Sequence, residues 1–539
     1  MSDFRLQSQR FLAKAENLLP RLREWEVPAR HLVVPEMDKQ AWQESRLVPS
    51  GTIDMLADRD FTTGDSFIVS LPETVVGHLA FRLVSQDGYA DSPSRLRITL
   101  GELPQEVLDP DKPYHGTLNG SWLQTEIVNI DDLPAEVMLP RRYSCRYIRF
   151  DMLGVPQKVR FDRIRIVACG AEADLPPAPA GLSGELLAID RASVRTLRNC
   201  MQTCFEDGPK RDRRLWLGDL RLQAMVNRVS YRRFDLVARS LYLLAGCVQP
   251  DGEVCGCVME HPVPRPGCRT HDYAMLFPVT LEEHCRWSGD YAIGAELFPV
   301  AARQLELMER FFEDDIFIGI NDPYGDWFFV DHDVELDRQA AVQGTMIFGL
   351  RALERLARCL GRTAEEEKLA ARSAALTAAA QKRFYNSATG LVESGPMRQI
   401  SFASQIWMIL ADVLSPEEGR RALTAAEKHP TARRPFSPYM FHYLLEAWIK
   451  CGDERKMLEL LRDYYGGMIR HGADTFWEVY RPTEPFFSPY NDVRMNSACH
   501  AWSGTAAYFL RKGYRYETAD VSMDGGGNAR SLRLSTCTA

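Results

Sequence analysis

One short segment of the sequence gathers acidic, basic and aromatic side chains. The run DGPKRDRRLWLGD holds three acids, Asp207, Asp212 and Asp219, next to Arg211 and Trp216. A carboxyl group that lies against an indole ring in a poorly solvated loop has a raised pKa, which is what a general acid requires. A solvated loop held by salt bridges is the alternative. We favour a catalytic role, because glycine and proline fix the backbone around the acids and a Leu-Trp-Leu run removes water from them.

A second acidic segment, 320–338, surrounds Trp327 and His332 with six carboxylates. A metal site of oxygen ligands is one interpretation, but no register of a calcium-binding loop can be written through these acids. We therefore expect a loop that supplies a sugar-stacking tryptophan and acceptors for sugar hydroxyls.

Two further segments carry single acids or histidines beside aromatic residues. In ADTFWEVYRP, Glu478 follows Trp477 at the predicted end of a helix, where it is either a buried structural acid or half of a catalytic pair. In CHAWSG, His500 lies at the start of the predicted last helix. Its neighbour Cys499 cannot form a thiol–imidazole dyad with it, because adjacent residues on a helix point away from each other.

These segments together indicate glycoside hydrolysis. Two acids from distant parts of the chain, with aromatic walls between them, are what the cleavage of a glycosidic bond needs. The WSG sequence is not the GxSxG turn of serine hydrolases. No GxxxxGK[ST] and no GxGxxG after a strand occurs in the sequence, so nucleotide chemistry has no support.

The thirteen cysteines are scattered, and only one group of them invites a metal interpretation. Cys247, Cys255, Cys257 and Cys268 could be drawn as a zinc site, but a CxC spacing lacks the usual CxxC knuckle. We expect buried or loop thiols there and no metal or other cofactor. Reduced thiols, and an N-terminus without the apolar stretch of a secretory signal, predict a cytoplasmic protein.

Composition excludes several classes of protein. The 539 residues exceed what one hydrophobic core holds, so two or three domains are expected. The chain is 45% apolar and 26% charged, which is ordinary for a soluble globular protein, and its net charge is −8. An acidic chain does not suit a sequence-independent nucleic-acid binder or a membrane-surface binder. No run approaches the ~18 consecutive apolar residues of a membrane span.

The elements that must position these residues fall into two parts. Short segments rich in β-branched and aromatic residues predict an antiparallel β-sandwich before a Pro-rich linker at 175–181. The predicted strands are 66–70, 76–84, 95–100, 122–129, 135–139, 147–152 and 159–168. Beyond the linker, apolar residues recur with helical spacing.

Twelve helices are predicted after the linker, at 185–204, 218–232, 233–247, 272–288, 290–313, 337–361, 363–385, 398–412, 415–428, 437–450, 453–467 and 495–512. Their number fits an all-α (α/α)6 toroid of six hairpins. An α-solenoid is the alternative, but no fixed-period repeat supports it. The predicted domains are therefore a β-sandwich over 1–182, a six-hairpin barrel over 183–515 and a short polar tail over 516–539.

The acidic segments resemble motifs of the α-L-rhamnosidases of glycoside hydrolase family 78. The loop 207–219 is similar to the first catalytic loop of that family, and YGDW (324–327), TFWE (475–478) and CHAWSG are similar to its later motifs. The resemblance extends over 200–512, and the upstream sandwich also matches the family layout. It implies an (α/α)6 catalytic barrel and an inverting mechanism.

Carried over position by position, the resemblance implies a role for each residue. Asp212 falls where the general acid lies and Glu478 where the general base lies, and such an inverting pair should be roughly 6.5–9.5 Å apart. The predicted substrate-binding residues are Asp207, Arg211, Trp216, Asp219, Tyr273, Trp327, Trp477 and His500. The substrate would be a small rhamnoside, with no nucleic acid or membrane as partner and a homodimer left open.

One departure from the family pattern leaves alternatives. Many members have Arg-Asp-Glu-Arg, whereas this chain has Arg-Asp-Arg-Arg at 211–214. Either Asp212 is the acid, or Asp219 takes that role, or the site is inactive and the protein binds carbohydrate without cleaving it. A polysaccharide lyase or a glycoside phosphorylase on the same barrel is a further alternative. We favour Asp212, because Trp216, Gly218 and Asp219 remain in register behind it.

Overall fold

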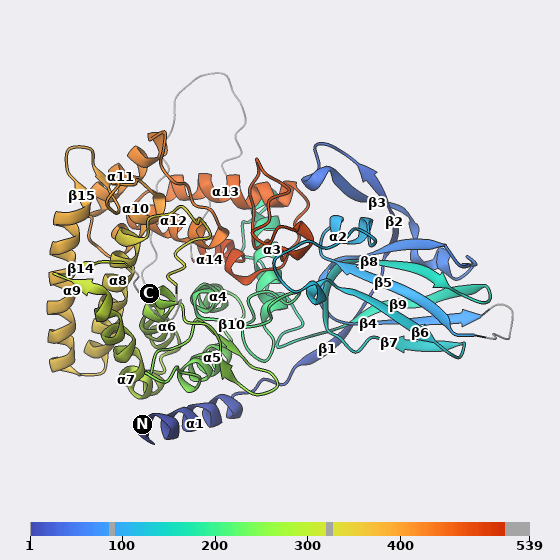
Figure 1. Cartoon of the computed structure of the whole chain (residues 1–539), viewed down its shortest axis with the longest axis horizontal. Helices are drawn as coiled ribbons and strands as arrows, with labels where there is room; N and C mark the ends of the chain where they lie inside the picture. Colours follow the sequence, from blue (N-terminus) through green and yellow to red (C-terminus); the bar gives the residue numbers. More distant parts are fainter. Residues whose placement is uncertain (1, 86–91, 320–326, 513–539) are drawn as a thin grey trace.

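The computed structural model describes residues 2–85, 92–319 and 327–512. Figure 1 shows two parts side by side, with strands from the first third of the chain in blue and cyan and a larger helical part in green to red. The predicted tail, 516–539, and most of the YGDW motif lie outside the described residues. None of the helices in the described ranges is long and apolar enough to cross a membrane.

The first part is an antiparallel sheet of nine strands with one apolar core. The strands are β1 (Arg23–Pro28), β2 (His31–Met37), β3 (Ser45–Thr52), β4 (Ser66–Ser85), β5 (Ser94–Gly101), β6 (Thr125–Ile130), β7 (Ala135–Met138), β8 (Tyr143–Gly154) and β9 (Val159–Gly170). Phenylalanines from β4, β8 and β9 meet at the centre of the core, with ring centroids about 5–6 Å apart. The predicted sandwich is confirmed.

Strand β4 explains how one sheet becomes two packed layers. Its first half pairs with β8 and β2, and its second half pairs with β9 and β7, with a register shift between Ser70 and Val75. A strand that changes partners at a bulge turns the corner between layers. The segments predicted as two strands, 66–70 and 76–84, are therefore one. Strands β1, β2 and β3 were not predicted; each contains a proline, and three of the six residues of β1 are charged.

The second part is a ring of helices, and the predicted six-hairpin toroid is confirmed. The inner helices are α4 (Leu217–Val229), α6 (His271–Ser288), α8 (Gln339–Cys359), α10 (Phe402–Leu410), α12 (Pro438–Lys450) and α14 (Ala506–Arg511). From α4 to α12 each contacts the next, α12 meets α14 through His442 and Phe509, and α14 returns to α4. All nine residues of α10 are buried, whereas only four of the 22 residues of α9 (Thr363–Phe384) are. This contrast separates an inner ring of helices from an outer one.

The helices are α1 (Ser2–Asn17), α2 (Gln105–Leu108), α3 (Gly184–Cys200), α4 (Leu217–Val229), α5 (Phe234–Gly246), α6 (His271–Ser288), α7 (Tyr291–Met308), α8 (Gln339–Cys359), α9 (Thr363–Phe384), α10 (Phe402–Leu410), α11 (Pro416–Lys428), α12 (Pro438–Lys450), α13 (Glu454–Arg470) and α14 (Ala506–Arg511). Eleven of the twelve predicted helices match these bounds within a few residues.

The predicted last helix, 495–512, is wrong over its first half. A 3-10 turn at Val493–Met495 and another at Ala501–Ser503 precede α14. Between the turns the backbone is held by partners from elsewhere: Glu478 N–H donates to the Ser497 carbonyl over 2.9 Å, and Ala501 N–H donates to the Asp207 carbonyl over 2.7 Å. These hydrogen bonds replace the helical ones, so local periodicity could not reveal them.

Helix α1 changes the division of the chain at its beginning. It precedes the sheet in sequence but packs against α5 of the helical ring. Phe11 stacks on Tyr242, and the Lys14 ammonium lies 2.5 Å from a Glu296 carboxylate oxygen. Helix α1 therefore contacts the helical part through Phe11 and Lys14, although the prediction placed this segment in the sandwich.

Candidate functional site

The loop between α3 and α4 is closed at its base by backbone hydrogen bonds. Asp207 N–H donates to the Arg214 carbonyl, and Arg214 N–H donates to the Asp207 carboxylate, both over 3.0 Å. The loop then enters β10 (Leu215–Trp216), which leads directly into α4. This closure projects residues 208–213 from the end of the helical ring that faces the sheet.

Arg211 and Glu478 form the centre of the site. One guanidinium nitrogen of Arg211 lies 2.6 and 2.5 Å from the two carboxylate oxygens of Glu478. Both side chains are buried, with exposed fractions of 4% and 3%. Burial alone would raise the pKa of the Glu478 carboxyl, but the charge of Arg211 outweighs it and holds that pKa well below its ordinary value.

Two residues that the sequence analysis missed also hold Glu478. The Tyr490 hydroxyl donates to one carboxylate oxygen over 2.5 Å, and Ser497 N–H donates to the other over 2.9 Å. The Tyr490 ring lies under the Arg211 guanidinium, 4.3 Å from its carbon. Both residues come from an irregular segment after α13, where no periodicity and no motif marks them. Glu478 itself lies in this segment, and not at the end of a helix as predicted.

Asp212 is held more loosely. Its carboxylate lies 3.5 Å from Arg211 and 3.9 Å from Arg214, and its side chain is 18% exposed. The next residue, Arg213, has a left-handed backbone with φ of 57°. Its side chain donates to the carbonyls of Pro209 and Arg142, which lies on the approach to β8. The Arg213 side chain thus points toward the sheet, while the carboxylates of Asp212 and Glu478 both contact the Arg211 guanidinium.

Asp207, Asp219 and His500 form a buried cluster beside this pair. His500 lies 3.9 Å from an Asp207 oxygen and 3.6 Å from an Asp219 oxygen. Burial raises the pKa of both aspartates well above the ordinary value, and neighbouring carboxylates add to the effect. Burial lowers the pKa of His500 to about 3, so its imidazole is neutral at neutral pH.

Three buried polar atoms around this cluster have no hydrogen-bond partner in the described residues: Asp219 Oδ1, His500 Nδ1 and His332 Nε2. Each lost hydrogen bond of a buried group costs roughly 1–3 kcal/mol. Both histidine rings pack on Trp502, with centroids 4.4 and 5.5 Å away. Unpaired donors and acceptors against an aromatic ring are suited to bind a hydroxylated ligand.

Aromatic side chains surround the cluster. The Trp216 ring packs edge to face on Tyr273, with centroids 6.3 Å apart. Tyr273 in turn contacts Phe329, and Phe329 contacts the partly exposed ring of Trp327. Gly218 is required beneath this wall, since a Cβ there would lie 2.3 Å from the Tyr273 ring. Three of the predicted aromatic residues are thus linked in one chain of contacts.

Trp477 is placed differently from the other predicted residues. Its ring packs on Trp42 of the sheet domain at 5.0 Å and on Tyr480 at 5.8 Å. It lines a separate cavity of about 310 Å³ between the sheet and the helices, together with Arg146 and Asp474. Its backbone neighbours Glu478, but its side chain faces the sheet domain.

The sheet domain buttresses the site through buried charges. Lys210, which precedes Arg211, lies 2.9 Å from Glu106 and 3.4 Å from Glu102. Glu102 also accepts a hydrogen bond from Ala498 N–H over 2.5 Å. The buried acid Glu102 of the sheet domain therefore contacts both the loop that carries Arg211 and Asp212 and the segment that carries Ser497 and His500.

The cysteines and acids of the described residues do not gather as a set of metal ligands. No group of three or more histidine, cysteine, aspartate or glutamate side chains that could hold a metal ion occurs within residues 2–85, 92–319 and 327–512. In the cysteine group, the Cys255 thiol donates to the Cys247 carbonyl over 3.3 Å, and the Cys268 thiol lies 3.8 Å from the Thr270 hydroxyl.

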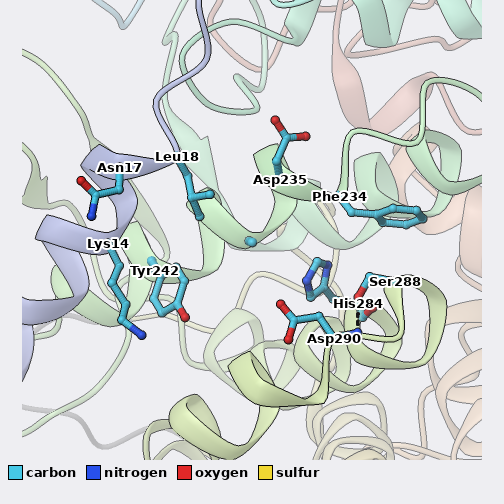
Figure 2. Close-up of a pocket in the computed structure, with 10 residues that line it drawn as sticks. Lys14, Asn17, Leu18, Phe234, Asp235, Tyr242, His284, Ser288 and Asp290 are labelled. Carbon is cyan, nitrogen blue, oxygen red and sulfur yellow. Dashed lines mark hydrogen bonds between the residues drawn. The ribbon is translucent and has the colours of Figure 1, made fainter.

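A surface cavity on the opposite side of the helical ring holds none of the predicted residues. Figure 2 shows it between α1 and helices α5 and α6, with Lys14, Tyr242 and His284 among its lining. Its volume is about 390 Å³.

Comparison with known proteins assigns both parts of this architecture. Residues 29–169 match the N-terminal domain of glycosyl hydrolase family 78 alpha-rhamnosidases, and residues 184–513 match the bacterial alpha-L-rhamnosidase six-hairpin glycosidase domain. The chain belongs to glycoside hydrolase family 78. It is therefore a glycosidase of the α-L-rhamnosidase type. A search of curated proteins gave no match.

Solved structures of this family share the fold. A rhamnosidase from Klebsiella oxytoca with rhamnose bound is 38% identical, with a TM-score of 0.90 over 94% of this chain and 98% of that one. A family 78 rhamnosidase from Bacillus sp. GL1 is 21% identical, with a TM-score of 0.71 over 83% of this chain and 46% of that one. An α-L-rhamnosidase from Streptomyces avermitilis complexed with L-rhamnose is 17% identical, with a TM-score of 0.65 over 92% of this chain and 44% of that one.

Proposed function

We propose that this protein releases terminal α-L-rhamnose from small rhamnosides with inversion of the anomeric centre, using Asp212 as general acid and Glu478 as general base. The observation that carries the proposal is the position of Arg211 between two carboxylates in different surroundings. Glu478 is buried and held ionised, whereas Asp212 is partly exposed at the mouth of the loop. A buried, ionised carboxylate suits a base that activates water, and a carboxylate open to solvent suits an acid that is reprotonated in each cycle.

The spacing of the two carboxylates is compatible with this proposal. Since both contact the same guanidinium group, their oxygens are separated by at most the order of 8 Å, and this limit includes the lower part of the roughly 6.5–9.5 Å range of inverting pairs. In an inverting reaction one water molecule lies between the base and the anomeric carbon. Glu478 takes a proton from this water while its oxygen bonds to the carbon. Asp212 gives a proton to the leaving oxygen as the glycosidic bond breaks on the other face.

Recognition of the sugar would fall to the buried cluster. Asp219 and His500 offer unpaired polar atoms to ring hydroxyls, and Asp207 lies beside them. Apolar faces of Trp216 and Trp327 suit the methyl group of a deoxysugar. The rhamnose bound to the Klebsiella oxytoca relative supports this choice of sugar. A cytoplasmic location is also proposed, because all twelve cysteines in the described residues are free thiols.

Hydrolysis of aryl glycosides tests the proposal. The wild type should cleave aryl α-L-rhamnoside far faster than the β-D-glucoside, α-L-arabinoside or α-L-fucoside, and Glu478→Gln should lose this activity. Binding of rhamnose without turnover by the wild type would contradict the enzymatic assignment. Normal hydrolysis by Asp212→Asn, together with inactive Asp219→Asn, would move the acid role to Asp219.

A further inference from the structure

The cavity between the sheet domain and the helical ring is built from both domains. Its volume of about 310 Å³ lies at the lower end of the range of small-ligand sites. The sheet domain contributes Trp42, Leu47 and Tyr147 to its lining, and the segment that follows α13 contributes His471 and Trp477. Within the part of the chain that the structure describes, no polar residue of the proposed sugar site lines this cavity. It is therefore a separate place where a ligand could bind.

Trp42 is held in the cavity wall by an unusual backbone. The two residues after it, Gln43 and Glu44, both have left-handed backbones, with φ of 53° and 57°. Such conformations cost free energy in residues other than glycine and persist only where the surrounding contacts impose them. Here the Gln43 side chain donates to the Pro485 carbonyl over 3.2 Å, and the Gln105 side chain donates to the Gln43 carbonyl over 3.1 Å. These contacts fix the position of the Trp42 ring.

The cavity has an aromatic wall. The Trp42 ring packs on Trp477 with centroids 5.0 Å apart and on His471 with centroids 5.3 Å apart. Trp477 is buried, whereas Trp42 and Tyr147 are only partly buried, so part of each of these two rings is open to a ligand. Large aromatic side chains combined with a few polar groups are typical of sites that bind small molecules.

Arg146 brings an unused hydrogen-bond donor to the cavity. Its Nη1 donates to the Gly472 carbonyl over 3.1 Å, but its buried Nε has no hydrogen-bond partner in the described residues. The carboxylate of Asp474 lies 3.8 Å from this guanidinium group and accepts hydrogen bonds from the Thr74 N–H and hydroxyl over 2.6 and 2.7 Å. A buried donor without an acceptor is unfavourable, and an oxygen atom of a ligand would satisfy it.

The charges around the cavity favour a neutral ligand. Each of the three arginines in its lining already contacts a carboxylate. The pairs are Arg46 with Glu36, Arg146 with Asp474 and Arg470 with Glu185. A negatively charged ligand would have to compete with these carboxylates for the arginines. A hydroxyl group avoids this competition, because it can accept from a guanidinium group and donate to a carboxylate.

We propose that this cavity is a second carbohydrate site, which binds one neutral sugar ring against the wall formed by Trp42, Tyr147 and Trp477. One sugar hydroxyl accepts a hydrogen bond from Arg146 Nε. Another donates to the carboxylate of Asp474, whose oxygens have further lone pairs beyond those that Thr74 uses. The apolar face of the sugar packs on the open parts of the aromatic rings. This site does not depend on the proposed hydrolytic function.

Fluorine NMR of the full chain labelled with 5-fluorotryptophan tests the site. Single Trp→Phe substitutions assign the signals of the ten tryptophans. Titration with D-glucose or L-rhamnose should shift the signals of Trp42 and Trp477 to saturation. The signals of Trp216 and Trp327 report on the proposed catalytic site in the same titration. Failure of the proposed function would leave those two signals unchanged with L-rhamnose and would not alter the result at Trp42.

Two variants should remove the binding, each with a matched control. Arg146→Lys keeps the positive charge but lacks Nε, so the Kd should rise about tenfold. Arg149→Lys, on the same strand but outside the cavity lining, should bind as the wild type does. Trp42→Ala should abolish the shift of the Trp477 signal. Trp25→Ala, which removes another partly buried tryptophan of the sheet domain, should leave that shift unchanged.

Three outcomes would overturn the proposal. The first is the absence of a saturable shift at Trp42 with either sugar. The second is equal binding by Arg146→Lys and the wild type, because the free Nε would then have no part in recognition. The third is a shift of the Trp42 signal with D-galacturonate but not with D-glucose, since the cavity would then select an anion. Circular dichroism shows that each variant is folded before its titration is interpreted.

Discussion

The two carboxylates that contact Arg211 are held in opposite ways. Glu478 is buried and accepts hydrogen bonds from Arg211, Tyr490 and a backbone N–H, all within 3 Å. Asp212 has only ion contacts of 3.5 and 3.9 Å and reaches solvent. A base that must stay ionised gains from a rigid set of donors. An acid that is reprotonated in every cycle gains from contact with water. The difference between the two surroundings therefore matches the difference between the two proposed roles.

Removing the base should give the largest effect. Glu478→Gln keeps the shape and an acceptor oxygen but cannot take a proton from water, so kcat should fall at least about 10³-fold for every rhamnoside. Steady-state kinetics on two substrates with good and poor leaving groups measures the loss. Circular dichroism confirms that the variant folds. A loss confined to the poor leaving group would reverse the comparison, because Glu478 would then behave as the acid.

Removing the acid should give a loss that depends on the substrate. Asp212→Asn should lower kcat about 10²–10³-fold on an alkyl rhamnoside, whose leaving oxygen needs a proton. Nitrophenolate is a good leaving group that departs without that proton, so hydrolysis of a nitrophenyl rhamnoside should be affected much less. The ratio of the two losses is the quantity to measure. Equal losses on both substrates would mean that Asp212 does not protonate the leaving group.

Weakening the ion pair between Arg211 and Glu478 should change the pH profile of kcat more than its maximal value. Arg211 is the main group that lowers the Glu478 pKa, so Arg211→Lys, with one point charge in place of a planar fork, should raise it. Below its pKa the base is protonated and inactive. The acidic limb of kcat should therefore move to higher pH, with a loss of about tenfold at the optimum. If the acidic limb of the kcat profile does not shift in Arg211→Lys, a group other than Glu478 determines it.

The smallest effect concerns stability. The pKa of His500 is lowered to about 3 in the folded protein, below the ordinary 6.5 of the unfolded chain. Its stabilising contribution is therefore complete above pH 6.5 and is lost as the pH falls toward 3. His500→Asn should flatten the decline of the free energy of unfolding between pH 6.5 and 4, measured by urea denaturation, by about 3 kcal/mol. His284→Asn, remote from the site and with a pKa lowered to about 4, is the matched control and should flatten it similarly.

Much of the fold could be predicted because its signal is local. Apolar spacing located the helices of the ring, and alternation located most of the strands. The last predicted helix failed because residues 496–501 bond to Glu478, Phe476 and Asp207, which are distant in sequence. The proline-containing strands β1 to β3 lack an apolar–polar alternation strong enough to mark them. Tertiary hydrogen bonds, and not propensity, decide such segments.

The site was predictable where the acids and aromatics lie in recognisable motifs. Asp207, Arg211, Asp212, Asp219, Glu478 and His500 come together through direct contacts. Tyr490 and Ser497 could not be found, because a hydroxyl and a backbone N–H in an irregular segment carry no pattern. Trp477 was predicted to line the sugar site, whereas its ring packs on Trp42 of the sheet domain. A motif gives the neighbourhood of a residue, but only packing gives the direction of its side chain.

The stereochemistry of the first product tests the central claim, that Glu478 activates water and does not bond to the sugar. Proton NMR during rapid hydrolysis of an aryl α-L-rhamnoside follows the anomeric signals before the sugar mutarotates. With Glu478 as the base, β-L-rhamnose should appear first and the α anomer only later. Initial release of α-L-rhamnose would mean retention through a covalent intermediate and would contradict the assignment of Glu478 as base.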